Sequence, residues 1–142
     1  MKFFFALLIS CAFLFPGCDN RPGVEWQKFT PERMLEAQQN HQPVFVDFYA
    51  AWCGPCMIMK DTTFKDPRVI EALAPFMRLK ADMSFRESEY TINLSRRYQI
   101  NGLPTVILFD PEGKEVIRTH FVAANQLLRI LSQHTSGSDS AS

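Results

Sequence analysis

Residues 46–56 read Val46-Asp47-Phe48-Tyr49-Ala50-Ala51-Trp52-Cys53-Gly54-Pro55-Cys56, and this stretch decides the fold of the 142-residue chain. It overlaps a nearly continuous apolar run, PVFVDFYA at 43–50, that is rich in β-branched and aromatic residues. Such a run predicts a strand that is buried on both faces, as in α/β sheets. A helical stretch from 55 to 64 follows. The two cysteines are therefore expected where a buried strand gives way to a helix.

The spacing of Cys53 and Cys56 suits thiol–disulfide exchange. A thiolate is the attacking species, and a free thiol with a pKa of about 8.5 is mostly protonated at neutral pH. The free N–H groups and the positive dipole end of a helix N-terminus favour the thiolate, so we expect Cys53 to be the nucleophile. Pro55 in the first helical turn loses no needed hydrogen bond. Cys56 is expected to be less exposed and to resolve the mixed disulfide.

A metal site is the main alternative for a pair of cysteines separated by two residues, since such a pair is half of many zinc sites. The three histidines, at 41, 120 and 134, are scattered along the chain. Met57 follows Cys56 directly, which departs from the haem-attachment pattern. We therefore expect no metal, and no cofactor besides the Cys53–Cys56 disulfide itself.

The N-terminus has the pattern of an export signal. Lys2 is followed by an apolar stretch at 3–15, which is shorter than the roughly 20 residues that span a bilayer. Gly17-Cys18 after this stretch resembles a bacterial lipobox, which implies a signal peptide at 1–17 and a lipid on Cys18. Asp19 resembles the signal that keeps such lipoproteins at the inner membrane. We expect a periplasmic protein with this anchor; a short membrane anchor or a buried helix is the alternative for 3–15.

The remaining residues predict one α/β domain at 24–134, after a tether at 18–23 and before a disordered tail at 135–142. A formal net charge of zero and the absence of a basic run give no sign of nucleic-acid binding. Expected strands lie at 24–29, 43–50, 76–82, 105–109 and 114–121. Expected helices lie at 31–40, 55–64, 67–73, within 84–98, and at 124–133.

Two motifs carry a resemblance to the thioredoxin family. Residues 46–56 resemble its active-site segment almost residue for residue. Gly102-Leu103-Pro104-Thr105, which begins 46 residues after Cys56, resembles its cis-proline loop. The resemblance covers about 24–133 and implies a thioredoxin-like α/β fold with a central mixed sheet flanked by helices.

The resemblance also implies roles for single residues. Pro104 would be cis and lie against the dithiol. Gly54 and Pro55 are the two residues between its cysteines. The backbone of Leu103, next to Gly102, would pair with a client peptide as an added strand.

Two more residues of the active-site segment acquire roles in the same way. Trp52 would flank the reactive sulfur. Asp47 corresponds to the buried acid of the family; burial raises the pKa of a carboxyl, so it would accept the proton of Cys56 during resolution. A hydrogen-bonded structural acid is the alternative for Asp47.

Other features are similar to the periplasmic C-terminal thioredoxin-like domain of DsbD-type disulfide reductases. They are Met57-Ile58-Met59-Lys60, the residues 63–69, and a long stretch from 82 to 102. This similarity implies disulfide-containing client proteins as partners and a membrane thiol electron donor of the DsbD or CcdA type. The chain resembles a free-standing relative, and a monomer is expected.

The direction of electron flow is predicted from the residues between the cysteines. Gly54-Pro55 is the thioredoxin dipeptide, and thioredoxin has a potential of about −270 mV against about −120 mV for the oxidant DsbA. We therefore favour a reductase. An oxidase or isomerase is the second reading. The third is a Cu(I) carrier, because Met57 and Met59 beside two thiols suit that ion, although packing or contact with clients also accounts for them.

Overall fold

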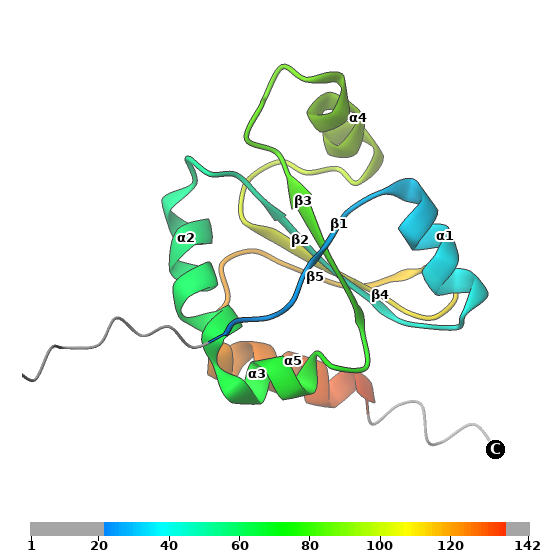
Figure 1. Ribbon diagram of the computed structural model, residues 1–142, viewed down its shortest axis with the longest axis vertical. Helices are drawn as coiled ribbons and strands as arrows, with labels where there is room; N and C mark the ends of the chain where they lie inside the picture. Colours follow the sequence, from blue (N-terminus) through cyan, green and yellow to red (C-terminus); the bar gives the residue numbers. More distant parts are fainter. Residues whose placement is uncertain (1–21, 136–142) are drawn as a thin grey trace, which may run out of the picture.

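A five-stranded mixed sheet forms the centre of the structure (Figure 1), a computed structural model that describes residues 22–135. The predicted signal peptide, Cys18 and residues 136–142 of the predicted tail lie outside the described residues. The strand order is β1-β3-β2-β4-β5. The strands are β1 (Gln27–Lys28), β2 (Val44–Tyr49), β3 (Met77–Asp82), β4 (Thr105–Phe109) and β5 (Glu115–Thr119).

The pairing of the strands confirms the predicted mixed sheet. β3 runs parallel to β1 and β2, whereas β4 runs antiparallel to β2 and β5. The predicted strand at 24–29 is wrong in its extent, since only Gln27–Lys28 pairs with β3. The reason is that the N–H of Val24 donates to the carbonyl oxygen of Phe64 (2.8 Å) and so bonds outside the sheet.

Side-chain caps fix where several helices begin. Thr30, Asp66 and Ser88 each accept a hydrogen bond from a backbone N–H two or three residues later, which satisfies a donor that the helix leaves free. The helices are α1 (Pro31–Gln39), α2 (Gly54–Asp61), α3 (Pro67–Ala72), α4 (Glu89–Arg97) and α5 (Ala124–Thr135), with a 3-10 turn η1 (Thr63–Lys65). The helix expected at 55–64 thus ends earlier, and the last helix runs two residues further than expected. Within residues 22–135 no helix is long and apolar enough to cross a membrane.

The sheet separates two apolar cores, because successive side chains of a strand point to opposite faces. Val46 and Phe48 of β2 belong to a core with Ala37 of α1 and Leu94 of α4. The other face of the sheet carries a second core, which contains Phe45 of β2, Met59 of α2, Val69 of α3, and Leu127 and Leu131 of α5. α2 therefore lies on the face to which the odd-numbered residues of β2 point, and Asp47 is one of these.

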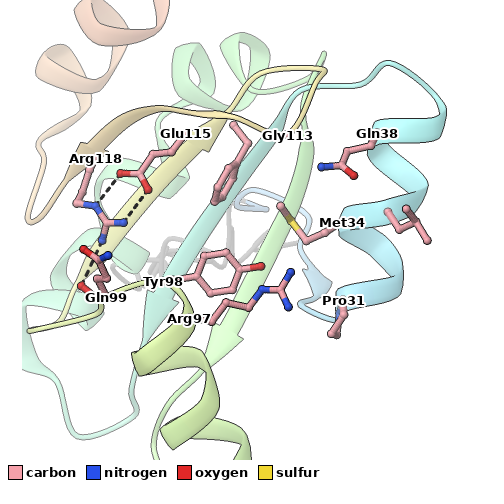
Figure 2. A pocket seen from close by; sticks show the side chains of 11 residues that line it. Pro31, Met34, Gln38, Arg97, Tyr98, Gln99, Gly113, Glu115 and Arg118 are labelled. Atoms are coloured by element: carbon pink, nitrogen blue, oxygen red, sulfur yellow. Dashed lines mark hydrogen bonds and ion pairs between the residues drawn. The ribbon is translucent and has the colours of Figure 1, made fainter.

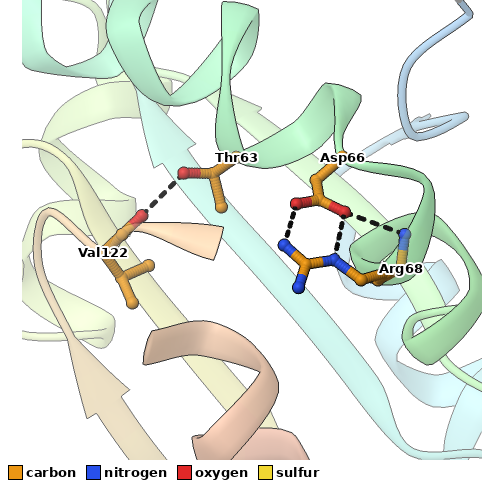
Figure 3. A network of polar contacts seen from close by, with 4 residues as sticks. All are labelled: Thr63, Asp66, Arg68 and Val122. Carbon is orange, nitrogen blue, oxygen red and sulfur yellow. Dashed lines mark hydrogen bonds and ion pairs between the residues drawn. The ribbon is translucent and has the colours of Figure 1, made fainter. Parts of the chain in front are cut away.

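A buried hydroxyl joins η1, the turn that follows α2, to the segment before α5 (Figure 3). Thr63 Oγ1 donates to the carbonyl oxygen of Val122 at 2.8 Å, and Thr63 is only 1% exposed. Close by, Asp66 caps α3 and forms a two-pronged ion pair with Arg68, with distances of 3.0 and 2.6 Å. The Arg68 pair is largely exposed, so the buried Thr63 bond is the one expected to contribute more to stability.

Replacing Thr63 by Val tests this bond. The change keeps the shape but leaves the Val122 carbonyl without its buried donor, so Thr63→Val is expected to lower the free energy of unfolding by about 1–3 kcal/mol. Thr62→Val is the matched control, since the Thr62 hydroxyl is exposed and bonds only within its own helix. Chemical denaturation measures both. Equal losses in the two variants would contradict the assignment.

Candidate active site

The two cysteines form a disulfide at the start of α2. Cys53 is the N-cap residue of this helix, and its Sγ accepts a hydrogen bond from the backbone N–H of Cys56 at 3.3 Å. The S–S bond joins residues whose Cα atoms are 5.3 Å apart. The same N–H that caps the disulfide would stabilise a thiolate on Cys53.

The exposed fractions of the two cysteines are nearly equal, at 5% for Cys53 and 4% for Cys56. The expected difference in exposure is therefore not present in the disulfide form. What distinguishes them is position: Cys53 Sγ lies at the helix N-terminus, whereas Cys56 is within the first turn.

The structure brings the cis-proline loop at 102–105 against the cysteine segment at 46–56. The peptide bond between Leu103 and Pro104 is cis, as expected. Leu103 packs on the small apolar cluster of Ala50, Cys53 and Cys56, and Pro104 is buried. Residues from two distant parts of the chain thus meet at the disulfide.

The two glycines among the predicted site residues have no packing requirement. A Cβ added at Gly54 or Gly102 would meet no heavy atom within 4 Å, and neither residue has a positive φ. Gly102 is exposed, and the neighbouring Leu103 is half-buried.

Trp52 lies half exposed next to the disulfide and is held by the segment after β3. Its Nε1–H donates to the carbonyl oxygen of Ser84 (3.0 Å), and the N–H of Ala51 donates to Ser84 Oγ (2.8 Å). The N–H of Ser84 in turn donates to Asp82 Oδ1 at 2.9 Å. Sequence reasoning missed Asp82 and Ser84, because nothing in the sequence pairs them with residues more than 30 positions earlier.

Asp47 is buried in β2 on the face covered by α2, with 3% of its surface exposed. Burial raises its pKa from 3.8 to about 6, although the neighbouring Lys80 acts in the opposite direction. Lys80 is the register partner of Asp47 on β3, and its Nζ lies 3.7 Å from Asp47 Oδ2. The expected buried acid with a raised pKa is thus present.

Lys80 was not predicted as a site residue. Its ammonium group lies over the rings of Tyr49 (4.4 Å) and Trp26 (5.3 Å), and its side chain is 18% exposed. The lysine therefore reaches from the buried carboxyl towards the surface. A sequence signal existed: Lys80 is a cation between the buried residues Leu79 and Ala81 of a strand.

His120 is a second residue that the sequence did not mark. Its Nδ1 lies 3.2 Å from the carbonyl oxygen of Pro104 and 3.4 Å from Thr105 Oγ1. This histidine, from the segment after β5, thus contacts the back of the cis-proline loop. It was expected only as one of three scattered histidines.

The methionines after Cys56 differ in their surroundings. Met59 is fully buried in the core with Phe45 and Phe64, whereas Met57 packs beside the disulfide. Met59 is therefore not available as a ligand next to the sulfurs. Among residues 22–135, no group of three His, Cys, Asp or Glu side chains could hold a metal ion.

A cavity of about 480 Å³ lies elsewhere, between α1, the end of α4 and the β4–β5 hairpin (Figure 2). Arg118 at its rim is paired with Glu115, and Gln38 lies close to Gly113. None of the predicted site residues lines this cavity. The chemistry is therefore assigned to the disulfide and its neighbours.

Residues 30–135 match the family model of the thioredoxin-like domain. The chain belongs to the thioredoxin-like family. Its disulfide at the N-terminus of α2 makes it a thioredoxin-like disulfide oxidoreductase.

Similar proteins include thiol:disulfide interchange proteins DsbD. That of Salmonella paratyphi A is 39% identical over 79 residues, which are 56% of this chain and 14% of that protein. That of Haemophilus ducreyi is 37% identical over 105 residues, which are 72% and 18%. The thioredoxin-like chain therefore spans less than a fifth of the length of these relatives.

Two solved structures show the same fold as this chain. A thioredoxin from Thermus thermophilus has a TM-score of 0.69 at 25% identity, covering 83% of this chain and 92% of its own. The reduced C-terminal domain of Neisseria meningitidis DsbD has a TM-score of 0.63 at 28% identity, covering 72% and 90%. The predicted resemblance to thioredoxins and to the DsbD C-terminal domain is thus confirmed.

The raised pKa of Asp47 makes stability depend on pH in a defined direction. The folded protein keeps this proton up to a pKa of about 6, whereas an unfolded aspartate, with a value of 3.8, loses it near pH 4. The stabilisation from proton binding is therefore complete below about pH 4 and is lost as the pH rises through about 6. This shift in the pKa of Asp47 corresponds to about 3 kcal/mol in the free energy of unfolding.

The variant Asp47→Asn lacks this titration. Between pH 4 and pH 7, oxidised Asp47→Asn is expected to gain about 3 kcal/mol of unfolding free energy relative to the parent protein. Denaturation curves at several pH values measure the difference. Asp61→Asn, at an exposed ion pair with Lys65, is the control and should follow the parent. If the free energy of unfolding changed with pH in the same way in Asp47→Asn and in the parent, the raised pKa of the buried Asp47 would be refuted.

Proposed function

We propose that this thioredoxin-like chain is an exported reductase that transfers electrons to disulfides of periplasmic client proteins. The observation that carries the proposal is the Cys53–Cys56 disulfide at the N-terminus of α2, packed against the cis Leu103–Pro104 bond. The DsbD relatives, named as thiol:disulfide interchange proteins, support this class of reaction.

The first step uses the reduced dithiol. The Cys53 thiolate attacks one sulfur of a client disulfide, whose S–S bond breaks as a new bond joins Cys53 to the client. The departing client sulfur leaves as a thiolate and takes up a proton. The Cys53 thiolate is favoured by the N-terminal N–H groups of α2, among them that of Cys56.

The second step releases the client. Asp47 takes the proton of Cys56, and the Cys56 thiolate attacks Cys53 in the mixed disulfide. The second client sulfur leaves as a thiol, and Cys53 and Cys56 become the disulfide that the structure contains. The client gains two electrons from the dithiol and takes up two protons from solvent, one of which balances the Cys56 proton that leaves through Asp47.

The raised pKa suits Asp47 for this transfer. A carboxyl group with a pKa of about 6 exchanges its proton near neutral pH, where an ordinary aspartate remains ionised. Lys80, 3.7 Å away and partly exposed, is placed to stabilise the carboxylate form of Asp47, which accepts the Cys56 proton and forms again when that proton is passed to solvent.

The client-binding edge is assigned to the cis-proline loop. In this proposal the backbone of Gly102, which is exposed, and of Leu103, which is half-buried, pairs with an extended client segment as an added strand. His120 bonds the Pro104 carbonyl from behind and so helps to fix the loop.

Re-reduction requires a donor of two electrons. A membrane dithiol protein of the DsbD or CcdA type fits, because the reaction is another disulfide exchange. Export, the lipid on Cys18, the inner-membrane location and the monomeric state stay predictions from the sequence, since the signal region lies outside the described residues. A reductase outside the cytoplasm depends on such a donor.

An oxidase or isomerase with the same site is the second candidate. It differs only in the potential of the disulfide, and the Gly54-Pro55 dipeptide favours the reductase. The copper-carrier alternative has little support, because Met59 lies in the core rather than beside the sulfurs.

Reduction of insulin by dithiothreitol tests the proposed reaction. The thioredoxin-like chain is expected to accelerate it at micromolar concentration, whereas Cys53→Ser is expected to be inactive. Cys56→Ser lacks the resolving thiol, so it should accumulate a covalent adduct with one insulin chain, visible by mass spectrometry.

The Cys18→Ser variant is a control for the chemistry, since Cys18 plays no part in the proposed exchange. It should match the parent in rate. Adduct formation by Cys53→Ser instead of Cys56→Ser would reverse the assigned roles, and no acceleration by the parent would refute the activity.

A further inference from the structure

The turn between β3 and α4 carries two large neighbouring side chains, Phe85 and Arg86, and the second of them lies over the active-site tryptophan. Phe85 is 76% exposed, which is the highest value among the exposed large apolar residues described. The guanidinium carbon of Arg86 lies 3.9 Å from the centroid of the Trp52 ring, so the guanidinium covers the indole. The β3–α4 connection lies at the same end of the sheet as the start of α2 (Figure 1). We name Trp52, Phe85 and Arg86 the turn surface.

Hydrogen bonds at both ends fix this turn. On one side, Ser84 accepts bonds from Ala51 and Trp52. On the other, the N–H and the hydroxyl of Ser88 both donate to the carbonyl oxygen of Phe85, at 3.1 and 2.9 Å. The exposed ring of Phe85 therefore projects from an ordered backbone, and burying it against a partner costs little backbone entropy.

The charge of Arg86 is available to a partner. Within residues 22–135 its guanidinium makes no ion pair within 4 Å, although Glu87 and Glu89 follow it in the chain. Stacking on an aromatic ring leaves the N–H edge of a guanidinium free to bind a carboxylate. A cation that forms no ion pair within the described residues thus lies over Trp52, the residue that precedes Cys53 in the chain.

The composition of the turn surface is that of an interaction site. Trp, Phe and Arg are enriched where proteins bind each other, and they contribute most of the binding energy there. A purely structural role for Arg86, shielding Trp52 from water, would leave the exposure of Phe85 unexplained. Because the Arg86 guanidinium is positively charged, charge complementarity favours a partner that carries a carboxylate beside this surface.

We propose that the turn surface recognises client segments in which an acidic residue and an apolar residue flank the reactive disulfide. The carboxylate pairs with Arg86 above Trp52, and the apolar side chain packs on Phe85. This inference rests on the proposed reductase function and adds a specificity to it.

Three synthetic peptides test the charge preference. Each is closed by one Cys–Cys disulfide, and they differ only in whether Glu, Gln or Lys flanks both cysteines. The kcat/KM for reduction by the reduced chain is measured for each peptide. Each value is then divided by the rate of reduction of the same peptide by dithiothreitol, an uncharged dithiol. This division removes differences in the intrinsic reactivity of the three disulfides. The Glu peptide is expected to react about threefold to tenfold faster than the Lys peptide.

The variants separate recognition from folding. Arg86→Gln should bring the Glu/Lys ratio close to one, and Arg86→Glu should invert it. Arg96→Gln, which removes an exposed arginine of α4, is the matched control and should keep the parent ratio. About 1 M NaCl, where the screening length is about 3 Å, should abolish the preference in the parent.

Phe85 is tested with the same peptides. Phe85→Ser should raise KM for all three by about threefold or more, whereas Leu35→Ser, an exposed apolar residue of α1, should not. Equal reduction of the Glu and Lys peptides by the parent, or an unchanged ratio in Arg86→Gln, would overturn this inference and leave the reductase standing. Failure of the parent to reduce any peptide would overturn both.

Discussion

The pairing of β2 with a strand on each side is the constraint on which the site depends. β2 exchanges hydrogen bonds with β3 and β4 along nearly its whole length, and its side chains are buried on both faces. The end of β2 is therefore fixed, and with it the short connection that leads into α2. Cys53 lies at this connection, so the helix N-terminus and the cis-proline loop before β4 meet at one point. A shift in β2 would move Asp47 and the disulfide together.

The same constraint imposes a cost at Asp47. An aspartate in a strand buried on both faces is hard to ionise, and the raised pKa expresses that penalty. Lys80 reduces the penalty without removing it, because its ammonium group is partly exposed and also lies over two aromatic rings. The protein therefore retains a destabilising group at neutral pH, which is understandable if the group moves a proton in the reaction.

Much of this was predictable from the sequence because the decisive signals are local. The apolar run at 43–50, the Cys53-Gly54-Pro55-Cys56 turn and the Gly102-Leu103-Pro104 motif each determine nearby backbone, and the mixed sheet follows from their order. The short β1 was not predictable, since Val24 bonds to Phe64, far away in the sequence. Ser84 and His120 were missed for the same reason: each acts on the site through a contact between distant segments. Lys80 was also missed, although a cation between apolar residues of a strand is itself a signal.

The direction of electron flow decides whether the protein is a reductase or an oxidase. The equilibrium reduction potential of the Cys53/Cys56 pair, titrated against glutathione, measures it most directly. A value below about −230 mV would agree with a reductant that depends on a membrane dithiol donor, as we predict. A value above about −160 mV would place the pair among oxidants such as DsbA and would contradict the proposed reductase.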